Sequence, residues 1–248
     1  MSDEIVEITD MGSGLVQIKM QDRAHKNTFS PELTNGLIEA FEKIKGTDHK
    51  VVILTGYDSY FASGGTQEGL LHLYEGKGKF TDTNLYSLAL DCSIPVISVM
   101  QGHGIGGGLV MGMFADFVIL SRESIYTTNF MKYGFTPGMG ATLILPQKLG
   151  ISLAEEMLLG AKTYYGEELQ KRGVPFPVLP RTELAEYALD LAHTLAEKPR
   201  VSLITLKDHL VAGLREKLPK VIDQEVAMHE KTFHQPEVKD RIETLFGN

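Results

Sequence analysis

The first half of the chain alternates short strand-like runs with helix-like runs. Val16–Met20 alternates apolar and polar side chains, which predicts a strand with one buried face. Ser30 followed by Pro31 is typical of a helix start, and the residues after it carry apolar side chains at helical spacing. Val51–Leu54 is a continuous apolar run closed by Gly56, the pattern of a strand that is buried on both faces.

The same strand–turn–helix unit then recurs. Ile94–Val99 predicts a second buried strand, a glycine-rich turn follows it, and Gly108–Ala115 predicts a tightly packed helix. Phe117–Leu120 predicts the next buried strand. This order of elements predicts an α/β architecture. Towards the C-terminus two amphipathic helices are expected, from Ser202 to about Leu218 and from Pro219 to about Phe233.

Composition and charge exclude several classes of function. The formal net charge of −8 argues against a nucleic-acid partner, because polyphosphate binding needs a basic surface. Cys92 is the only cysteine, which rules out an internal disulfide and a structural thiolate zinc site. The N-terminus lacks the basic-then-apolar order of a secretory signal, and the apolar runs are too short to span a bilayer. We therefore expect a cytoplasmic protein with no membrane partner.

Two glycine-rich turns follow predicted strands, at Phe61–Thr66 and at Gly102–Gly108. Glycine leaves backbone amides free to face a ligand, and a helix that starts in such a turn adds its positive end. Close packing of a helix on a sheet explains one such turn equally well. A dinucleotide site is disfavoured because no acidic residue ends a suitable strand about 20 residues further on. A phosphate-binding P-loop is disfavoured because no Walker lysine follows either turn.

Taken together, these segments resemble the enoyl-CoA hydratase/isomerase, or crotonase, superfamily. The resemblance rests on segments that occur in the family's order within residues 1–160: Asp22–Ser30, Val52–Gly56, Phe61–Gly65, Gln101–Gly108, Phe114–Ile119 and Gly134–Gly140. It implies an α/β crotonase fold, with a spiral of ββα turns over residues 1–195 and a C-terminal helical lobe over 196–248. It also implies a homotrimer or a dimer of trimers, held together through that lobe.

The resemblance assigns two backbone amides, those of Gly65 and Gly107, to the oxygen of an acyl thioester. Amides aimed at that oxygen stabilise the charge of an enolate. Further residues of the substrate pocket are expected beside them: Ala62, Gly64, Thr66, His103, Val110 and Phe130. No cofactor is expected, because the thioester itself is the electron sink, and no metal site is expected.

The sequence departs from the family where its hydratases carry two glutamates. Val110 and Phe130 occupy those positions, and neither side chain transfers a proton or holds a water molecule. Hydration is therefore disfavoured. An apolar pocket beside an enolate-stabilising pair of amides suits decarboxylation, because a dry pocket raises the energy of a carboxylate relative to a delocalised dienolate.

Within the superfamily this pattern resembles the decarboxylases of polyketide β-branching cassettes, of the bacillaene type. That resemblance implies conversion of a 3-methylglutaconyl group to 3-methylcrotonyl, carried by the phosphopantetheine arm of an acyl carrier protein or by coenzyme A. It implies that Lys79 and His229 do the chemistry. Lys77 could replace Lys79, and His103 is the second candidate histidine. Three tyrosines are candidates for the pocket wall: Tyr74, Tyr86 and Tyr133. The other histidines are expected at solvent-exposed or packing positions: His25, His49, His72, His209 and His234.

Two other functions stay open at this point. One is an enoyl-thioester isomerase that uses Lys79 or His229 as its base on a substrate without a carboxylate. The other is a non-catalytic subunit that binds an acyl-carrier arm. The missing glutamates favour the non-catalytic subunit, and the intact pair of oxyanion turns argues against it.

Overall fold

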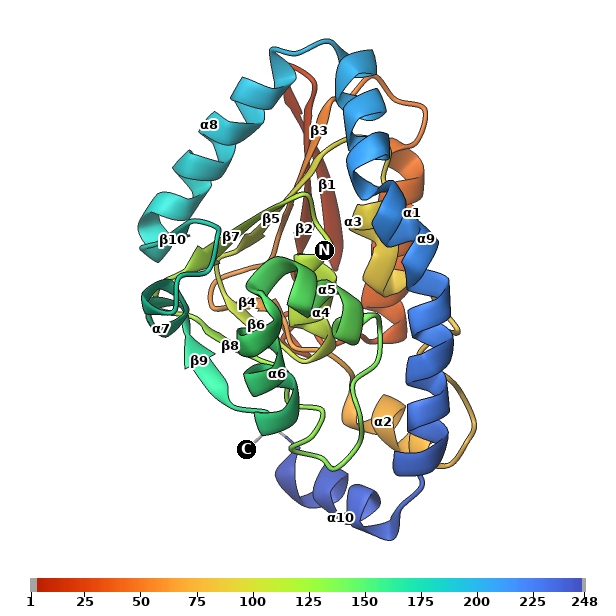
Figure 1. The fold of residues 1–248 in the computed structure, drawn as a ribbon. Helices are drawn as coiled ribbons and strands as arrows, with labels where there is room; N and C mark the ends of the chain where they lie inside the picture. Colours follow the sequence, from red (N-terminus) through yellow and green to blue (C-terminus); the bar gives the residue numbers. More distant parts are fainter. Residues whose placement is uncertain (1–3, 247–248) are drawn as a thin grey trace.

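The strands of the computed structural model, which describes residues 4–246, form two sheets (Figure 1). The larger sheet has the order β1-β2-β3-β5-β7-β10, and the smaller has the order β4-β6-β8-β9. The strands of the larger sheet are β1 (Val6–Gly12), β2 (Leu15–Met20), β3 (Val51–Thr55), β5 (Val96–Met100), β7 (Phe117–Ser121) and β10 (Val178–Leu179). Those of the smaller sheet are β4 (Tyr60–Ala62), β6 (His103–Ile105), β8 (Ile125–Thr127) and β9 (Thr163–Tyr165). β1 pairs antiparallel with β2 and β8 with β9, and the other neighbours are parallel.

The chain winds through both sheets in repeated ββα turns. A strand of the larger sheet, a strand of the smaller sheet and a helix follow one another as β3–β4–α2, β5–β6–α4 and β7–β8–α5. The helices are α2 (Gln67–Tyr74), α4 (Gly107–Met113) and α5 (Ala141–Leu149). The spiral of ββα turns predicted from the sequence is therefore confirmed.

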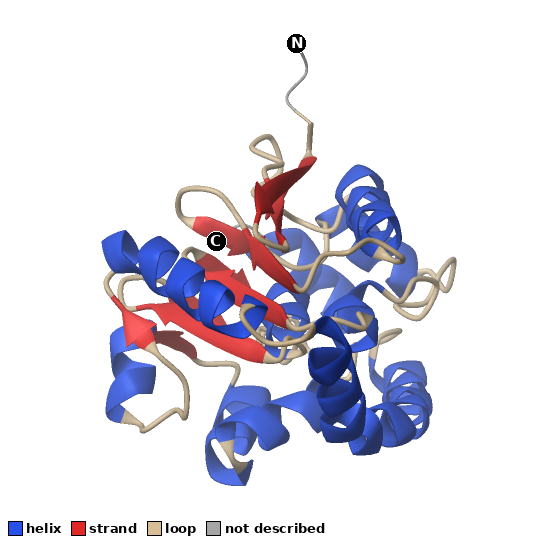
Figure 2. Ribbon diagram, turned by 90° about the horizontal axis from the view of Figure 1, so that it is seen from above, coloured by secondary structure: helices blue, strands red, loops and turns tan. Residues whose placement is uncertain are grey.

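Strand β3 is buried on both faces, as its continuous apolar run predicts. Val52 and Leu54 point into the main core, which α1 (Pro31–Ile44) covers. Val51 and Ile53 point to the opposite face, where α8 (Leu184–Ala196) packs. Figure 2 shows helices on both sides of the strands. The alternation has the two-residue period of a strand, although every side chain in it is apolar.

The remaining elements pack around this layered core. They are a 3₁₀ turn at Leu85–Ser87, α3 (Leu88–Asp91), α6 (Ile151–Gly160), α7 (Gly166–Lys171), a 3₁₀ turn at Arg181–Glu183, α9 (Arg200–Thr232) and α10 (Pro236–Leu245). No helix within residues 4–246 is both long and apolar enough to cross a membrane.

The C-terminal part differs from the sequence prediction, because α9 is one helix of 33 residues with Pro219 inside it. The prediction of two helices that meet at Pro219 is therefore wrong. An interior proline costs a helix about 3 kcal/mol. Burying a Leu or Ile side chain contributes about 1.5–3 kcal/mol. Leu218 and Ile222 are both buried on either side of the proline, so packing offsets the lost helical hydrogen bond.

Helix α9 is fixed to the main core along its length. The Lys207 ammonium is buried and lies 2.7 Å from a carboxylate oxygen of Asp116, and it also donates to the carbonyls of Ala89 and Ile94. Phe233, just after the helix, belongs to the same hydrophobic cluster as the strands. The boundary between a core at 1–195 and a lobe at 196–248 stays a prediction, and both parts contribute side chains to one core.

The two glycine-rich turns lie so close together that neither Gly64 nor Gly108 has room for a side chain. A Cβ atom on Gly108 would lie 2.2 Å from the carbonyl oxygen of Ala62. A Cβ atom on Gly64 would lie 2.8 Å from the carbonyl oxygen of Ile105, and Gly64 also has a φ of +75°. Glycine at these two positions therefore sets the distance between the turns.

We expect the substitution of alanine for glycine to have opposite effects at two helical positions. Gly108→Ala should lower the free energy of unfolding by at least about 1–3 kcal/mol, because its methyl group overlaps the backbone of Ala62. Gly213→Ala, at an exposed position in α9 with no atom within 4 Å of the new methyl group, should raise it by about 0.4–1 kcal/mol. Urea unfolding of both variants at one protein concentration checks this, and equal effects would contradict it.

Candidate active site

One cavity brings together the residues on which the sequence prediction most depends. Its volume is about 560 Å³. Six of the predicted site residues lie in its wall: Gly65, Thr66, Lys79, Gly107, Phe130 and His229. They come from both glycine-rich turns, the loop after α2, the segment after β8 and the C-terminal half of α9. Residues far apart in the sequence therefore face one space.

Four other residues that were predicted for this wall lie behind it. Val110 and Ala62 are completely buried in the main core, and Gly64 lies beside Gly107, with 3.3 Å between the position of a Cβ on Gly64 and the Gly107 nitrogen. His103 lies in β6, where its Nδ1 accepts a hydrogen bond from the Ile125 amide at 3.1 Å. His103 does not line the cavity, so the structure brings His229 and not His103 to the same space as Lys79.

The Gly65 and Gly107 amides have the surroundings expected of an oxyanion hole. Both residues line the cavity, and within residues 4–246 neither N–H donates to a carbonyl of the protein. Gly107 is the first residue of α4, so its amide has no helical partner. The two turns are adjacent, since a Cβ on Gly64 would lie 3.3 Å from the Gly107 nitrogen. Both amides are thus free to donate to a bound oxygen atom.

His229 is held in one orientation by a backbone carbonyl. Its Nε2 lies 2.7 Å from the carbonyl oxygen of Thr136. Because a carbonyl oxygen only accepts, Nε2 must carry a hydrogen, and Nδ1 of the neutral ring is left as an acceptor. The rings of Phe80 and Phe233 lie 4.9 and 5.2 Å from the imidazole, centroid to centroid. Burial among these groups lowers the pKa of His229 below its ordinary value, although the carbonyl contact opposes this.

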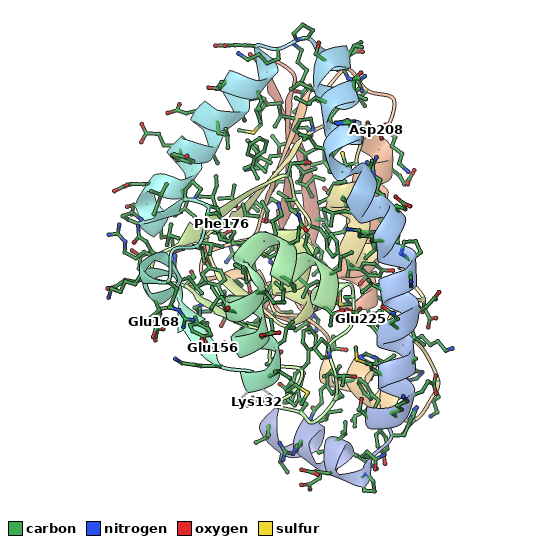
Figure 3. The ribbon with its side chains drawn as sticks, viewed as in Figure 1. Lys132, Glu156, Glu168, Phe176, Asp208 and Glu225 are labelled. Atoms are coloured by element: carbon green, nitrogen blue, oxygen red, sulfur yellow. The ribbon has the colours of Figure 1, made fainter. Side chains whose placement is uncertain are left out.

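His229 belongs to a polar stripe on α9, made of Glu225, His229 and Thr232, that contacts the segment 134–142. Figure 3 labels Glu225 on α9. Its carboxylate accepts hydrogen bonds from the Gly140 amide at 2.7 Å and from the Thr142 amide at 2.9 Å. The Thr232 hydroxyl lies 3.0 Å from the Thr136 hydroxyl. The stripe therefore fixes the segment whose carbonyl orients His229.

Sequence reasoning missed this stripe. The signal was present, because Glu225 and Thr232 lie four residues before and three residues after His229, on the same face of a helix. A carboxylate on a face that must be buried needs hydrogen-bond donors. The donors, however, are backbone amides about 85 residues away in the chain, and no local pattern identifies them.

The loop after α2 distinguishes the two candidate lysines. Lys77 is paired with the Glu75 carboxylate at 2.6 Å and does not line the cavity. Lys79 lines it, and among residues 4–246 no carboxylate lies within ion-pair distance of its ammonium group. Its backbone is fixed by Asp82, whose carboxylate accepts from the Lys79 amide at 2.8 Å. Lys79 is therefore the lysine that can meet a bound anion.

Much of the remaining wall is apolar. Phe80, Phe135, Met139 and Phe233 belong to it, and sequence reasoning named none of them as pocket residues. Met139 has a φ of +64°, and its sulfur lies 2.6 Å from the position of a Cβ on Gly107, so it packs directly against the oxyanion turn. A non-glycine residue in this conformation is strained, which is common where a wall must approach a ligand closely.

The candidate tyrosines separate into one inside the wall and two outside it. Tyr86 lines the cavity, and burial raises the pKa of its phenol, so the hydroxyl stays a hydrogen-bond donor. Tyr133 lies behind the wall, stacked on Phe135 with ring centroids 6.0 Å apart. Tyr74 is outside it too, and its carbonyl oxygen binds the His234 ring. His72, expected away from the site, lines the cavity.

No cluster of three or more metal-ligating side chains occurs in the part of the chain that the structure describes. The polar groups in the cavity wall include the two unpaired amides, Lys79, the imidazoles of His229 and His72, the Tyr86 phenol and the carboxylates of Glu68 and Asp82, in surroundings rich in phenyl rings.

Comparison with known proteins identifies relatives over the full length of the chain. The enoyl-CoA hydratase/isomerase family model matches residues 10–246. The bacillaene synthase decarboxylase PksI of Bacillus subtilis (strain 168) is 68% identical over 249 residues, which covers 100% of both chains. A solved structure from a dehydratase/decarboxylase enzyme couple involved in polyketide β-branching is 68% identical with a TM-score of 0.98, and the match covers 98% of this chain and 100% of that one. The decarboxylase domain of CurF from Lyngbya majuscula is 46% identical with a TM-score of 0.94, at 98% and 100% coverage.

We expect His229 to titrate below the ordinary histidine value of 6.5, because burial disfavours the imidazolium form. An NMR pH titration checks this, with the signal assigned by its loss in His229→Gln. Phe80→Ala removes a ring that packs on the imidazole and should raise the pKa towards 6.5. A wild-type value at or above 6.5 would contradict the prediction.

The lowered pKa of His229 also determines whether the folded protein gains or loses stability as pH falls. The unfolded chain takes up the proton of His229 at a higher pH than the folded chain does. The folded protein should therefore lose stability as pH falls from 6.5 through the lowered pKa, and His229→Gln should lack this component. Unfolding curves of both proteins across this window measure the difference.

Glu225→Gln should lower the free energy of unfolding by about 1–3 kcal/mol, because the new amide group cannot accept from both backbone N–H groups that the carboxylate binds. Glu216→Gln, at an exposed position on the same helix, is the matched control and should stay within about 0.5 kcal/mol of wild type. Chemical unfolding of both variants checks this. Equal stability of the two variants would show that the contact between α9 and segment 134–142 is not important for the fold.

Proposed function

The chain belongs to the enoyl-CoA hydratase/isomerase family, and from that premise we propose that it removes CO₂ from a 3-methylglutaconyl thioester and forms the 3-methylcrotonyl thioester. One observation carries the proposal: the Gly65 and Gly107 amides, Lys79, His229 and the ring of Phe130 line a single cavity. Such a cavity can stabilise an enolate and supply a proton. At residue 130, however, it offers a phenyl ring and no carboxylate that could activate water.

The relatives support decarboxylation over the two other functions that the sequence left open. One relative is named a decarboxylase of bacillaene synthase, and the solved CurF domain is also named a decarboxylase. A third belongs to a dehydratase/decarboxylase couple of polyketide β-branching. These named activities favour decarboxylation over enoyl isomerisation and over a non-catalytic role in binding an acyl-carrier arm.

The two amides act on the thioester oxygen. As the bond to the terminal carboxylate breaks, its electron pair moves through the double bond towards that oxygen and gives a dienolate. The Gly65 and Gly107 N–H groups donate to the oxygen as its charge grows, so they bind the transition state more tightly than the substrate. Loss of one such donor costs about 10²–10³ in rate in other enzymes.

The phenyl rings of the wall favour the same step because they raise the energy of the bound substrate relative to the dienolate. A carboxylate is less well solvated in a cavity rich in aromatic side chains than in water, whereas a delocalised dienolate loses less by the transfer. Phe130 also occupies the place from which an acidic side chain would activate water. The cavity is thus suited to the loss of CO₂ and unsuited to hydration.

Lys79 and His229 receive the remaining two tasks, which are to orient the carboxylate and to return a proton to carbon. Lys79 suits proton delivery better, because the Nε2 hydrogen of His229 is already engaged by the Thr136 carbonyl and the Nδ1 atom of the neutral ring carries none. In this scheme the neutral imidazole positions the substrate. Two observations support these roles: the orientation of the His229 ring, and the absence of a carboxylate partner for the Lys79 ammonium within residues 4–246.

We further propose the setting in which the enzyme works. The acyl group is carried on the phosphopantetheine arm of an acyl carrier protein, with coenzyme A as the alternative carrier, and the enzyme assembles as a homotrimer or dimer of trimers in the cytoplasm. The support for the carrier is the naming of one relative within bacillaene synthase and of another within polyketide β-branching.

Incubation with 3-methylglutaconyl carrier protein should reduce the mass of the acyl group by one CO₂, read by mass spectrometry. Lys79→Ala and His229→Ala should slow this loss by about 10²–10⁴-fold, the range for removal of an acid–base group. Lys77→Ala is the matched control, since that ammonium is paired with Glu75 outside the cavity, and it should retain wild-type activity.

The other outcomes assign the other functions. Movement of a double bond in a substrate that lacks the carboxylate, without any loss of mass from the glutaconyl thioester, would establish the isomerase. Tight binding of the acyl carrier without turnover of either substrate would establish the non-catalytic subunit.

A further inference from the structure

A second, smaller cavity adjoins the first one beside Lys79 and His229. Its volume is about 150 Å³, and it shares Lys79, Phe80 and His229 with the wall of the main cavity. It is also lined by Glu230 and His234, which are exposed. This space, which we call the side cavity, therefore extends from the two candidate acid–base groups to the surface.

The side cavity has both the room and the polarity that water requires. A volume of about 150 Å³ accommodates several water molecules, each of which needs two or more polar partners to be held. Lys79 and Glu230 offer charged groups to it. His234 donates from Nδ1 to the Tyr74 carbonyl at 2.6 Å, which leaves Nε2 of its neutral ring as an acceptor. Water in this space would touch titratable groups at both of its ends.

The proposed reaction can use such a route, because each turnover consumes one proton. The balance is R–CO₂⁻ + H⁺ → R–H + CO₂: the bond from carbon to the carboxylate breaks, its electron pair enters the dienolate, and a C–H bond forms with a proton from the enzyme. The donor must then recover a proton from solvent. In the proposed reaction the acyl arm would fill the main cavity, which Gly65 and Gly107 line, until the product leaves.

We propose that the side cavity is a water-filled conduit through which solvent returns the proton to Lys79 and through which CO₂ leaves, while the acyl arm still fills the main cavity. The inference rests on the proposed function, because a reaction that consumes a proton and releases a small molecule can use a second opening. Glu230 and His234, at the outer end, take the proton from bulk water and pass it inward along the water.

Val226 is the residue at which the conduit can be closed with least harm to the site. It lies on α9 one turn before His229, it is half-buried, and it lines the side cavity without lining the main one. Val226→Phe adds volume directly into the side cavity. Ala227→Phe adds a larger side chain at an exposed position of the same helix, and so serves as the matched control.

The experiment is rapid-quench measurement of CO₂ loss from 3-methylglutaconyl carrier protein in excess over enzyme. In Val226→Phe the first turnover should keep the wild-type rate, because the enzyme starts with its proton in place. Later turnovers should be slower by about tenfold or more, as expected when acid catalysis waits for its proton. The result is a burst of one equivalent followed by a slow phase that slows further in D₂O. Wild type and Ala227→Phe should show no burst.

A second variant guards against simple distortion of the neighbouring histidine. Glu230→Leu makes the exposed end of the side cavity apolar and should give the same burst. If both variants slow the first turnover as much as the later ones, or if neither slows any turnover, the conduit is overturned. Absence of CO₂ loss from wild-type enzyme is a different outcome, since it overturns the proposed function itself.

Discussion

The contact between the two glycine-rich turns is the constraint on which the candidate site depends. The Ala62 carbonyl lies where a side chain on Gly108 would be, and the Ile105 carbonyl lies where one on Gly64 would be. These turns follow neighbouring strands of the smaller sheet, β4 and β6, so the sheet brings them side by side and glycine lets them touch. The contact between the turns places the two free amides, at Gly65 and Gly107, in the wall of one cavity.

The chemistry then requires that the C-terminal part of the chain return to these turns, and α9 achieves this with polar contacts. A helix that packed only through apolar side chains could rotate or slide by small amounts without losing much burial. The carboxylate of Glu225, which needs two specific backbone amides, fixes α9 against segment 134–142 and so fixes His229 one turn later. Burying this carboxylate costs desolvation, which raises its pKa, and three hydrogen bonds from Gly140 and Thr142 offset that cost.

Sequence reasoning succeeded where the physical cause is local. The buried strand at Val51–Leu54 and the helix start at Ser30 follow from side-chain pattern and capping chemistry, and the Ser30 hydroxyl does accept from the Leu33 amide. It failed where the cause is a distant contact. Pro219 ends a helix by its own chemistry, but packing of residues on both sides against the core overrides it. The family resemblance located Lys79 and His229, whereas Glu225 and Met139 emerge only when the chain is folded.

Val110 and Phe130, the two positions at which the resemblance places the glutamates of the hydratases, have different surroundings, so a glutamate would have a different effect at each. Phe130 faces the cavity, so an acidic side chain there would meet the substrate and water. Val110 is completely buried in the main core, behind the wall, where a carboxylate would need hydrogen-bond donors that its apolar neighbours do not offer. Substitution of glutamate at 130 alone would therefore restore a polar group to the cavity, whereas substitution at 110 would first destabilise the fold. The apolar character of this site therefore depends on the core as well as on the cavity wall. A polar side chain at position 110 would require repacking of α4, the helix that presents the Gly107 amide.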